Sequence, residues 1–259
     1  MRVLVTGASR GIGRAICQRI AADSRFANVQ IAACGSTHAQ ALQSLADELR
    51  ADVENVVTLT GDLSLPSTSQ RLVAEACEAM GGIDAIVSNA GIGKPNSLRD
   101  MTVEQWDQVF NTNLRATWLL AQAAYEELRR TRGHIITVAS MSGVAPQPGM
   151  GAYSPAKAGL IMLTRLMAQE WADARIRANC VSPGMVHTDM TQEAYADEEF
   201  RRLRASFAPA GYIADPLQDI AGVVAFLLSD DARYCNGQNI VVDGGVTDSM
   251  LRILPVRTS

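Results

Sequence analysis

A tyrosine and a lysine four residues apart, Tyr153 and Lys157, open a segment with the periodicity of an α-helix. Residues at this spacing lie on the same helix face, so the two side chains are expected to lie close together. A phenol ordinarily titrates near about pH 10, and a neighbouring ammonium group favours its anionic form. Such a pair can move a proton to or from a reacting oxygen atom. Alone, however, the spacing arises often by chance, usually as a pair on the protein surface.

Two further polar residues stand where they could take part in the same reaction. Ser140 follows the apolar run 134–139, and a hydroxyl at the end of a parallel strand reaches into the crevice at that edge of the sheet. Ser142 lies close behind and is expected to point elsewhere if the chain is still extended. Asn113 falls inside a predicted helix, 103–130, where asparagine is disfavoured. Either it bends the helix by holding a water molecule, or it is simply tolerated there.

A glycine-rich turn, Thr6-Gly7-Ala8-Ser9-Arg10-Gly11-Ile12-Gly13, follows the first predicted strand and leads directly into a helix. Glycines let the backbone turn tightly and approach a pyrophosphate closely, and the helix start directs free N–H groups at an anion. The spacing differs from the general dinucleotide fingerprint because its first gap holds three residues instead of one. The alternative is a tight strand-to-helix turn without a ligand.

The end of the second predicted strand, 29–33, bears on which dinucleotide would bind. In NAD-binding folds an acid about 20 residues after the turn binds the ribose 2′-hydroxyl, but no Asp or Glu lies between Asp23 and Asp47. Neutral residues follow this strand instead, and Ser36 or Thr37 among them can donate a hydrogen bond. Arg10 can supply positive charge to a 2′-phosphate, unless it is an ordinary solvated charge. The sequence therefore favours NADP(H) over NAD(H).

Apolar runs alternate with segments of helical period along most of the chain. Several runs are apolar nearly end to end, as parallel strands covered on both faces are. The predicted strands are 3–6, 29–33, 56–59, 85–88, 134–139, 177–182 and 240–242, and the predicted helices are 12–22, 39–50, 67–80, 103–130 and 153–172. The alternation predicts a single α/β domain, 1–259, with a Rossmann-type doubly wound parallel sheet of about seven strands and helices on both faces. The charge-rich segment 184–215 is predicted to be a substrate lid.

Composition argues against several other classes of protein. Hydrophobic residues make up 47% of the 259 and charged residues 19%, which is typical of a globular protein, and the net charge of −4 argues against nucleic-acid binding. The five cysteines and three histidines show no spacing typical of a metal site or a disulfide framework. No apolar run approaches the roughly 20 residues of a membrane span, and no secretory signal opens the chain. We therefore expect no metal, nucleic-acid or membrane partner, and a cytoplasmic location.

Taken in order, the motifs resemble those of the short-chain dehydrogenase/reductase family. The set comprises the glycine-rich turn, Asp62, Asn89-Ala90-Gly91, Asn113, Ser140, Tyr153 with Lys157, Pro183-Gly184 and Asp243-Gly244-Gly245. Each motif is weak alone, but the ordered set is specific and runs over almost the whole chain. One departure is Ser88, where asparagine commonly precedes Asn-Ala-Gly, and we expect it to have little effect.

The resemblance implies a role for each of four catalytic residues. Tyr153 becomes the general acid/base, and Ser140 binds and polarises the substrate oxygen. Lys157 holds the nicotinamide ribose and stabilises the tyrosinate. Asn113 anchors a water molecule in the proton relay.

The resemblance also implies a set of residues that bind the cofactor. In that set Asp62 resembles the residue that meets the adenine ring, and Thr188 the residue that binds the carboxamide. The full predicted set is Gly7, Ser9, Arg10, Gly11, Ile12, Gly13, Ser36, Asp62, Leu63, Asn89, Ala90, Gly91, Tyr153, Lys157, Pro183, Gly184, Val186 and Thr188.

The implied activity is that of an NADP(H)-dependent oxidoreductase that interconverts a carbonyl group and a secondary alcohol. A 3-oxoacyl thioester is one candidate substrate, because the glycine-rich turn and the Asp-Gly-Gly ending resemble those of NADPH-dependent 3-oxoacyl-(acyl-carrier-protein) reductases. The alternative is a cyclic or secondary-metabolite ketone or alcohol. A non-catalytic NADP-sensing protein is disfavoured because all four catalytic residues are present. Relatives commonly pack as tetramers, so a homotetramer is the expected assembly.

Overall fold

One parallel sheet organises residues 1–249, the part of the chain that the computed structural model describes; residues 250–259 of the predicted domain lie outside it. The strand order is β3-β2-β1-β4-β5-β6-β7, and every pairing is parallel. The strands are β1 (Arg2–Thr6), β2 (Gln30–Gly35), β3 (Asn55–Thr60), β4 (Ala85–Ser88), β5 (His134–Val138), β6 (Arg177–Pro183) and β7 (Asn239–Val242). The prediction of a Rossmann-type doubly wound sheet is confirmed.

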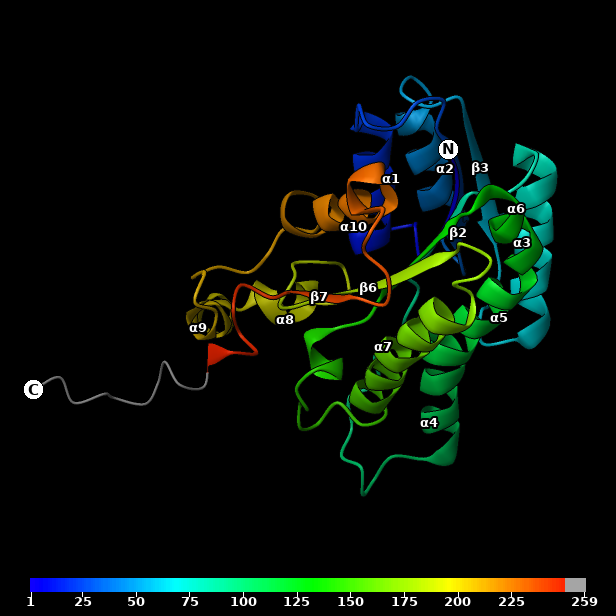
Figure 1. The fold of residues 1–259 in the computed structure, drawn as a ribbon. Helices are drawn as coiled ribbons and strands as arrows, with labels where there is room; N and C mark the ends of the chain where they lie inside the picture. Colours follow the sequence, from blue (N-terminus) through cyan, green and yellow to red (C-terminus); the bar gives the residue numbers. More distant parts are fainter. Residues whose placement is uncertain (250–259) are drawn as a thin grey trace, which may run out of the picture.

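Helices cover both faces of the sheet, as Figure 1 shows. Buried side chains of α1 (Gly11–Ala22), α2 (Ala39–Leu49) and α10 (Ala221–Leu228) pack against one face. The other face is covered by α3 (Pro66–Met80), α5 (Ala116–Ala123), α6 (Tyr125–Thr131) and α7 (Tyr153–Glu170). Within residues 1–249 no helix combines the length and apolar character that crossing a membrane requires.

Burial explains why the strands could be read from the sequence. β1, β2, β4, β5 and β6 are buried over nearly all their residues, whereas the edge strands β3 and β7 are half-buried. Strands covered on both faces need apolar side chains at consecutive positions rather than at alternate ones. The continuous apolar runs therefore mark the centre of the sheet.

The predicted single helix over 103–130 is wrong. The structure has α4 (Val103–Phe110), a π-helical turn (Asn111–Arg115), α5 and α6, with Ala124 between the last two in a non-helical conformation. A π-helical turn holds one extra residue per turn, and such turns are frequent at functional sites. Asn113, which the sequence singled out as disfavoured in a helix, lies in this turn, where the helix type changes.

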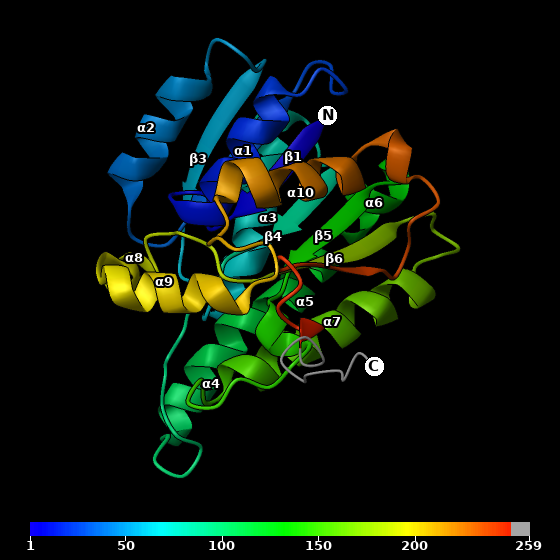
Figure 2. The same cartoon turned by 90° about the vertical axis from the view of Figure 1, so that its left-hand side faces the viewer.

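Helices that sequence analysis did not identify follow β6. The segment 184–215 contains α8 (Gln192–Ala196) and α9 (Glu198–Phe207), which Figure 2 shows together at one side of the molecule. α10 was missed because its eight residues, Ala-Gly-Val-Val-Ala-Phe-Leu-Leu, are almost all apolar, so the period of an amphipathic helix is absent. The remaining short elements are the 3₁₀ turns Met141–Gly143 and Asp230–Ala232 and the π-helical turn Pro216–Ile220.

Backbone hydrogen bonds close the base of the 184–215 segment. The N–H of Ala214 donates to the carbonyl of Met185 at 2.9 Å, and the N–H of His187 donates to the carbonyl of Ala214 at 2.9 Å. Val186 and Ala214 thereby form a parallel bridge at a narrow neck. A third bond joins the N–H of Ala210 to the carbonyl of Gly244 at 3.0 Å, so the segment also rests on the Asp-Gly-Gly ending.

His134 is the first residue of β5, and its surroundings disfavour the protonated form of its ring. Its Nδ1 is buried and has no hydrogen-bond partner among the described residues. Burial, and then the positive charge of Arg177, lower the pKa of His134 from its ordinary 6.5 to about 4. Between these two pH values the unfolded chain binds a proton that the native chain does not bind, so the free energy of unfolding falls as the pH falls from 6.5 toward 4.

We predict that His134→Gln reduces the loss of stability on acidification, because the variant has no imidazole to protonate on unfolding. Urea unfolding at pH 7 and pH 5 should give a smaller pH-dependent change in the free energy of unfolding for the variant than for the wild type. His187→Gln, at an exposed position, is the matched control and should behave like the wild type. Equal changes for His134→Gln and the wild type would contradict this explanation.

Candidate active site

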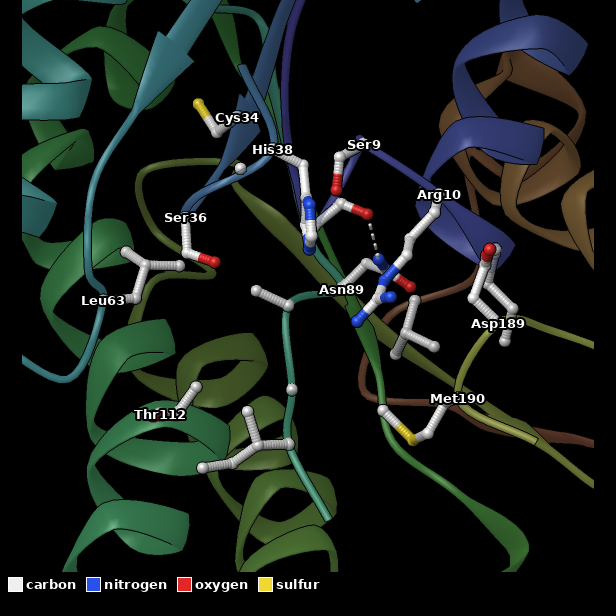
Figure 3. A pocket seen from close by; sticks show the side chains of 18 of the residues that line it. Ser9, Arg10, Cys34, Ser36, His38, Leu63, Asn89, Thr112, Asp189 and Met190 are labelled. Carbon is white, nitrogen blue, oxygen red and sulfur yellow. Dashed lines mark hydrogen bonds between the residues drawn. The ribbon is translucent and has the colours of Figure 1, made fainter. Parts of the chain in front are cut away.

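A cavity of about 470 Å³ opens at the carboxyl edge of the sheet. It extends across the point between β1 and β4 where the order of the strands reverses, which is where open α/β sheets bind ligands. Figure 3 shows this cavity and the side chains from separate strand ends and helices that line it. The predicted cofactor residues that line it are Gly7, Ser9, Arg10, Gly11, Ile12, Ser36, Asp62, Leu63, Asn89, Ala90, Gly91, Tyr153, Lys157 and Thr188.

The remaining predicted cofactor residues lie beside the cavity rather than in its lining: Gly13, Pro183, Gly184 and Val186. Gly13 is packed so tightly that a Cβ there would overlap the carbonyl oxygen of Gly7. Gly184 similarly lies against the backbone of Asp243. These glycines let two backbone segments meet behind the cavity, which is a structural role that their motif alone does not distinguish from ligand contact.

The glycine-rich turn has the geometry of an anion site. Gly7 and Gly11 have φ values of +68° and +54°, which favour glycine. Helix α1 begins directly after Arg10, without a side-chain cap and without an acidic residue in its first turn. Its first N–H groups are therefore free to bind an anion such as a pyrophosphate. This turn fits the dinucleotide that the sequence motif predicts.

The end of β4 is held against this turn by hydrogen bonds. The side chain of Asn89 donates to the carbonyls of Thr6 at 3.0 Å and Gly7 at 3.3 Å. The hydroxyl of Thr6 accepts from the N–H groups of Asn89 and Ala90, both at 3.1 Å. Asn89 thus links the ends of the first and fourth strands, and it lines the cavity together with Gly91 two residues later.

Asn113 is buried, and both polar atoms of its side chain bind the backbone of Ile92. Its Oδ1 accepts the N–H of Ile92 at 2.8 Å, and its Nδ2 donates to the carbonyl of Ile92 at 2.9 Å. Gly91 lies directly beside it, because a Cβ there would come within 3.2 Å of Asn113 Oδ1 and 3.4 Å of Lys157 Nζ. The side chain of Asn113 therefore fixes the π-helical turn to the segment after β4, next to the lysine.

Lys157 is 3% exposed, and its Nζ donates a hydrogen bond to the carbonyl of Val138 at 2.8 Å. Burial lowers the pKa of Lys157 from its ordinary 10.5 to about 8, while Cys180 acts weakly in the opposite direction. The ammonium lies 5.7 Å from the centre of the Tyr153 ring. The predicted pairing of the two side chains on one face of α7 is therefore observed.

Burial dominates the titration of Tyr153 as well. It raises the pKa of the phenol above its ordinary value of 10, and a hydrogen bond with Ser140 opposes that rise. The nearby ammonium was expected to favour the tyrosinate, but in this structure burial has the larger effect. A neutral phenol is the form that can donate a proton.

Ser140 is oriented by the turn that follows it. The N–H of Ser142 donates to Ser140 Oγ at 3.1 Å, which leaves the hydroxyl hydrogen of Ser140 to donate to Tyr153 or, in its place, to a bound ligand. Ser142 does point elsewhere, as expected, since its own hydroxyl donates to Gln147 Oε1 at 2.9 Å. The chain is not extended at this point, however, because Met141–Gly143 forms a 3₁₀ turn.

Sequence analysis missed several side chains that line the cavity. His38 follows Ser36 and Thr37, the two hydroxyl residues that the sequence did indicate, at the end of β2, and Met190 follows Thr188 in the 184–215 segment. The rule that strand ends line the site would have included these neighbours. Further missed lining residues also lie at or after strand ends: Cys34, Gly35, Gly61, Ile92, Val138 and Ala139. Asp189 lies in the 184–215 segment, whereas Leu72, Gln108 and Thr112 belong to helices and carry no such signal.

Known proteins are similar to this sequence over nearly the whole chain. Residues 7–247 match the family model described as enoyl-(acyl carrier protein) reductase. The chain is 39% identical to the 3-oxoacyl-[acyl-carrier-protein] reductase FabG of Escherichia coli K12, covering 94% of this chain and 96% of that one. It is 38% identical to the L-rhamnose 1-dehydrogenase (NAD(P)(+)) of Azotobacter vinelandii, covering 94% and 95%.

A solved structure extends the likeness to three dimensions. The short chain dehydrogenase of Burkholderia cenocepacia J2315 in complex with NADP has a TM-score of 0.86 and 33% sequence identity, with 95% of this chain and 97% of that chain covered. The fold is therefore shared with this dehydrogenase over nearly the whole chain. This chain belongs to the short-chain dehydrogenase/reductase family.

Proposed function

We propose that this chain is an NADP(H)-dependent oxidoreductase that interconverts a carbonyl group and a secondary alcohol. The observation that carries the proposal is that Tyr153 and Lys157 line the same cavity as the glycine-rich anion site, with Ser140 hydrogen-bonded to Tyr153 behind the lining. A proton donor and a dinucleotide site in one cavity suit redox chemistry at a carbon–oxygen bond.

The protein side of the reaction follows from these contacts. When bound, the cofactor supplies the hydride to the carbonyl carbon or receives it from there. Tyr153, held neutral by burial, gives its phenolic proton to the carbonyl oxygen during reduction. Ser140 donates its hydroxyl hydrogen to the same oxygen, where negative charge develops. In oxidation the proton moves the other way.

Lys157 and Asn113 hold this arrangement. The ammonium of Lys157 places a positive charge beside Tyr153, which stabilises the tyrosinate that remains after proton transfer. Asn113 keeps Gly91 close to Lys157, and we propose that it anchors the water of the proton relay. Asn113 lies in the π-helical turn, and turns of this kind are frequent at functional sites.

Several residues support NADP(H) as the cofactor. The β2–α2 connection carries no acid, and Arg10 and Ser36 both line the cavity. Among residues 1–249 Arg10 forms no ion pair, so its charge is available to a phosphate. The similar Burkholderia structure contains NADP, whereas the name of the similar L-rhamnose dehydrogenase allows either cofactor.

The substrate we propose is a 3-oxoacyl thioester, with the 184–215 segment acting as the lid. Met190 lines the cavity, and the large apolar side chains of Phe200, Phe207 and Tyr212 are exposed on the same segment. These side chains suit an acyl substrate. Identity is nearly equal to a 3-oxoacyl reductase and to a sugar dehydrogenase, so a cyclic ketone or sugar alcohol is the second candidate.

We propose a cytoplasmic homotetramer as the working form. Large apolar side chains are exposed on α5 and α7, among them Trp118, Met162 and Leu166. Exposed apolar surface of this kind on two helices suits packing between copies of the chain.

The central test is Tyr153→Phe, which removes the phenolic proton but keeps the ring. We expect turnover to fall by at least about 10²-fold because proton transfer is lost, while the affinity for NADPH stays nearly unchanged. Turnover is measured from NADPH absorbance during reduction of a panel of 3-oxoacyl thioesters and cyclic ketones. The affinity for NADPH is measured by fluorescence titration. A fully active variant would remove Tyr153 from the mechanism. Tight NADPH binding with no turnover of any substrate by the wild type would favour an NADP-sensing protein.

Lys157→Met should separate activity from stability. We expect turnover to be lost, whereas the variant without cofactor should be at least as stable as the wild type at pH 7, because a buried charge is removed. Between about pH 8 and 10.5 the unfolded chain keeps a proton that native Lys157 has lost, so the wild type gains stability as the pH rises. The advantage of the variant in urea unfolding should therefore shrink from pH 8 to pH 10. If the difference in the free energy of unfolding did not change with pH, the titration of Lys157 would not be its cause.

Arg10→Ala tests the cofactor. Loss of the guanidinium should raise the KM for NADPH by about tenfold and leave the KM for NADH nearly unchanged, because only NADPH carries the 2′-phosphate. Steady-state kinetics with both cofactors gives this comparison directly. If the wild type prefers NADH, or if the variant loses both cofactors equally, Arg10 is not a phosphate ligand.

A further inference from the structure

The connection between β2 and α2 is only three residues long. β2 ends at Gly35 and α2 begins at Ala39, so Ser36, Thr37 and His38 alone join them. All three line the cavity, and all three are exposed. A connection this short keeps each side chain at the carboxyl end of β2, with little freedom to leave it.

Close backbone contacts hold the glycine-rich turn against this connection. The N–H of Ala8 donates to the carbonyl of Cys34 at 2.9 Å. A Cβ at Gly35 would lie 3.5 Å from the Cβ of Ser9. Arg10, two residues after Ala8, therefore projects into the same end of the cavity as the β2–α2 connection.

The imidazole of His38 lies between these two segments. In Figure 3 its ring points into the cavity, with Ser36 on one side and Ser9 and Arg10 on the other. Its backbone is fixed, because its carbonyl accepts the N–H of Leu42 at 3.1 Å in the first turn of α2. Among residues 1–249 no side chain hydrogen-bonds to the imidazole ring, so both of its nitrogens are available to a ligand.

We propose that His38 is a specificity-determining residue that binds the cofactor's 2′-phosphate together with Arg10 and Ser36, and that it makes the preference for NADP(H) over NAD(H) depend on pH. This rests on the proposed NADP(H) dependence. An imidazole gains or loses its charge between about pH 5 and 8, whereas a guanidinium stays charged. A protonated imidazole at position 38 would give the phosphate a second cation beside Arg10.

The other titratable groups around this end of the cavity do not replace His38 in that role. Cys34 is buried below the connection, and the carboxylate of Asp62 accepts the N–H of Ser64 at 2.8 Å. Asp189 lines the cavity from the 184–215 segment. Behind the connection, Arg14 is engaged with Glu48 and with the carbonyl of Ala41. At the end of β3, Arg71 is engaged with Glu75 and with the carbonyl of Thr60. Among residues 1–249, Arg10 and a protonated His38 are thus the cationic groups left for a phosphate at this end.

A second titration has the opposite sign and can be separated. A phosphate monoester loses its second proton near about pH 6, so its attraction to Arg10 grows as the pH rises. The contribution of His38 falls over the same range. A variant with a permanent charge at position 38 keeps the first effect and lacks the second.

The test measures dissociation constants of NADP⁺ and NAD⁺ by calorimetry at pH 6 and pH 8 for the wild type, His38→Arg and His38→Gln. The quantity compared is the ratio of the NAD⁺ to the NADP⁺ constant, which isolates the 2′-phosphate. This ratio is followed from pH 6 to pH 8 in each protein. Relative to the change in His38→Arg, the ratio of the wild type should fall by about fivefold to tenfold. His38→Gln should show the lower ratio already at pH 6. Thermal unfolding of each variant confirms that it is folded.

The outcomes distinguish this inference from the proposed function. If NADP⁺ is preferred throughout but the wild type and His38→Arg change in parallel with pH, the role of His38 is overturned and the cofactor proposal stands. The same holds if His38→Gln binds NADP⁺ as tightly as the wild type at pH 6. If all three proteins prefer NAD⁺ at both pH values, the cofactor proposal is overturned and this inference with it.

Discussion

The buried ammonium group of Lys157 is the constraint around which the rest of the site is arranged. Among the described residues its one hydrogen-bond acceptor is the carbonyl of Val138, and burial lowers its pKa to about 8. A cation in such a place costs stability, because a single carbonyl does not replace the water it has lost. The surroundings make room for it: Gly91 has no side chain to crowd it, and Asn113 fixes the backbone beside Gly91. The fold thus holds a charge at the position where chemistry needs one.

Parallel strands explain how residues far apart in the chain reach that charge. Each strand of a doubly wound sheet ends at the same edge, so the residues after β1, β2, β4 and β5 meet there although long helices separate them in sequence. Hydrogen bonds between these strand ends, such as those from Asn89 to Thr6 and Gly7, turn a common edge into a defined cavity. The glycine-rich turn and the Tyr153–Lys157 pair thereby come to line the same cavity.

Much of this could be predicted from the sequence, for reasons that particular residues show. Central strands are buried on both faces, so continuous apolar runs such as residues 3–6 can be recognised in the sequence. Residues four apart lie on the same face of any helix, which is why the pairing of Tyr153 and Lys157 could be predicted. The π-helical turn around Asn113 could not be predicted, because it depends on the backbone of Ile92, which lies 21 residues away in sequence. α10 is apolar all round and has no period to detect. The high pKa of Tyr153 was also out of reach, since burial is a property of the folded chain.

The narrow neck at Met185, His187 and Ala214 has a consequence for how such proteins diversify. The hydrogen bonds that close it join backbone atoms, so they impose little restriction on the side chains between them. Side chains of the enclosed segment can therefore be exchanged without breaking these bonds, and some of them, such as Thr188 and Met190, form part of the cavity wall. Sequence changes there would alter the cavity wall while the base of the segment stays closed, which agrees with the nearly equal similarity of this chain to an acyl reductase and to a sugar dehydrogenase.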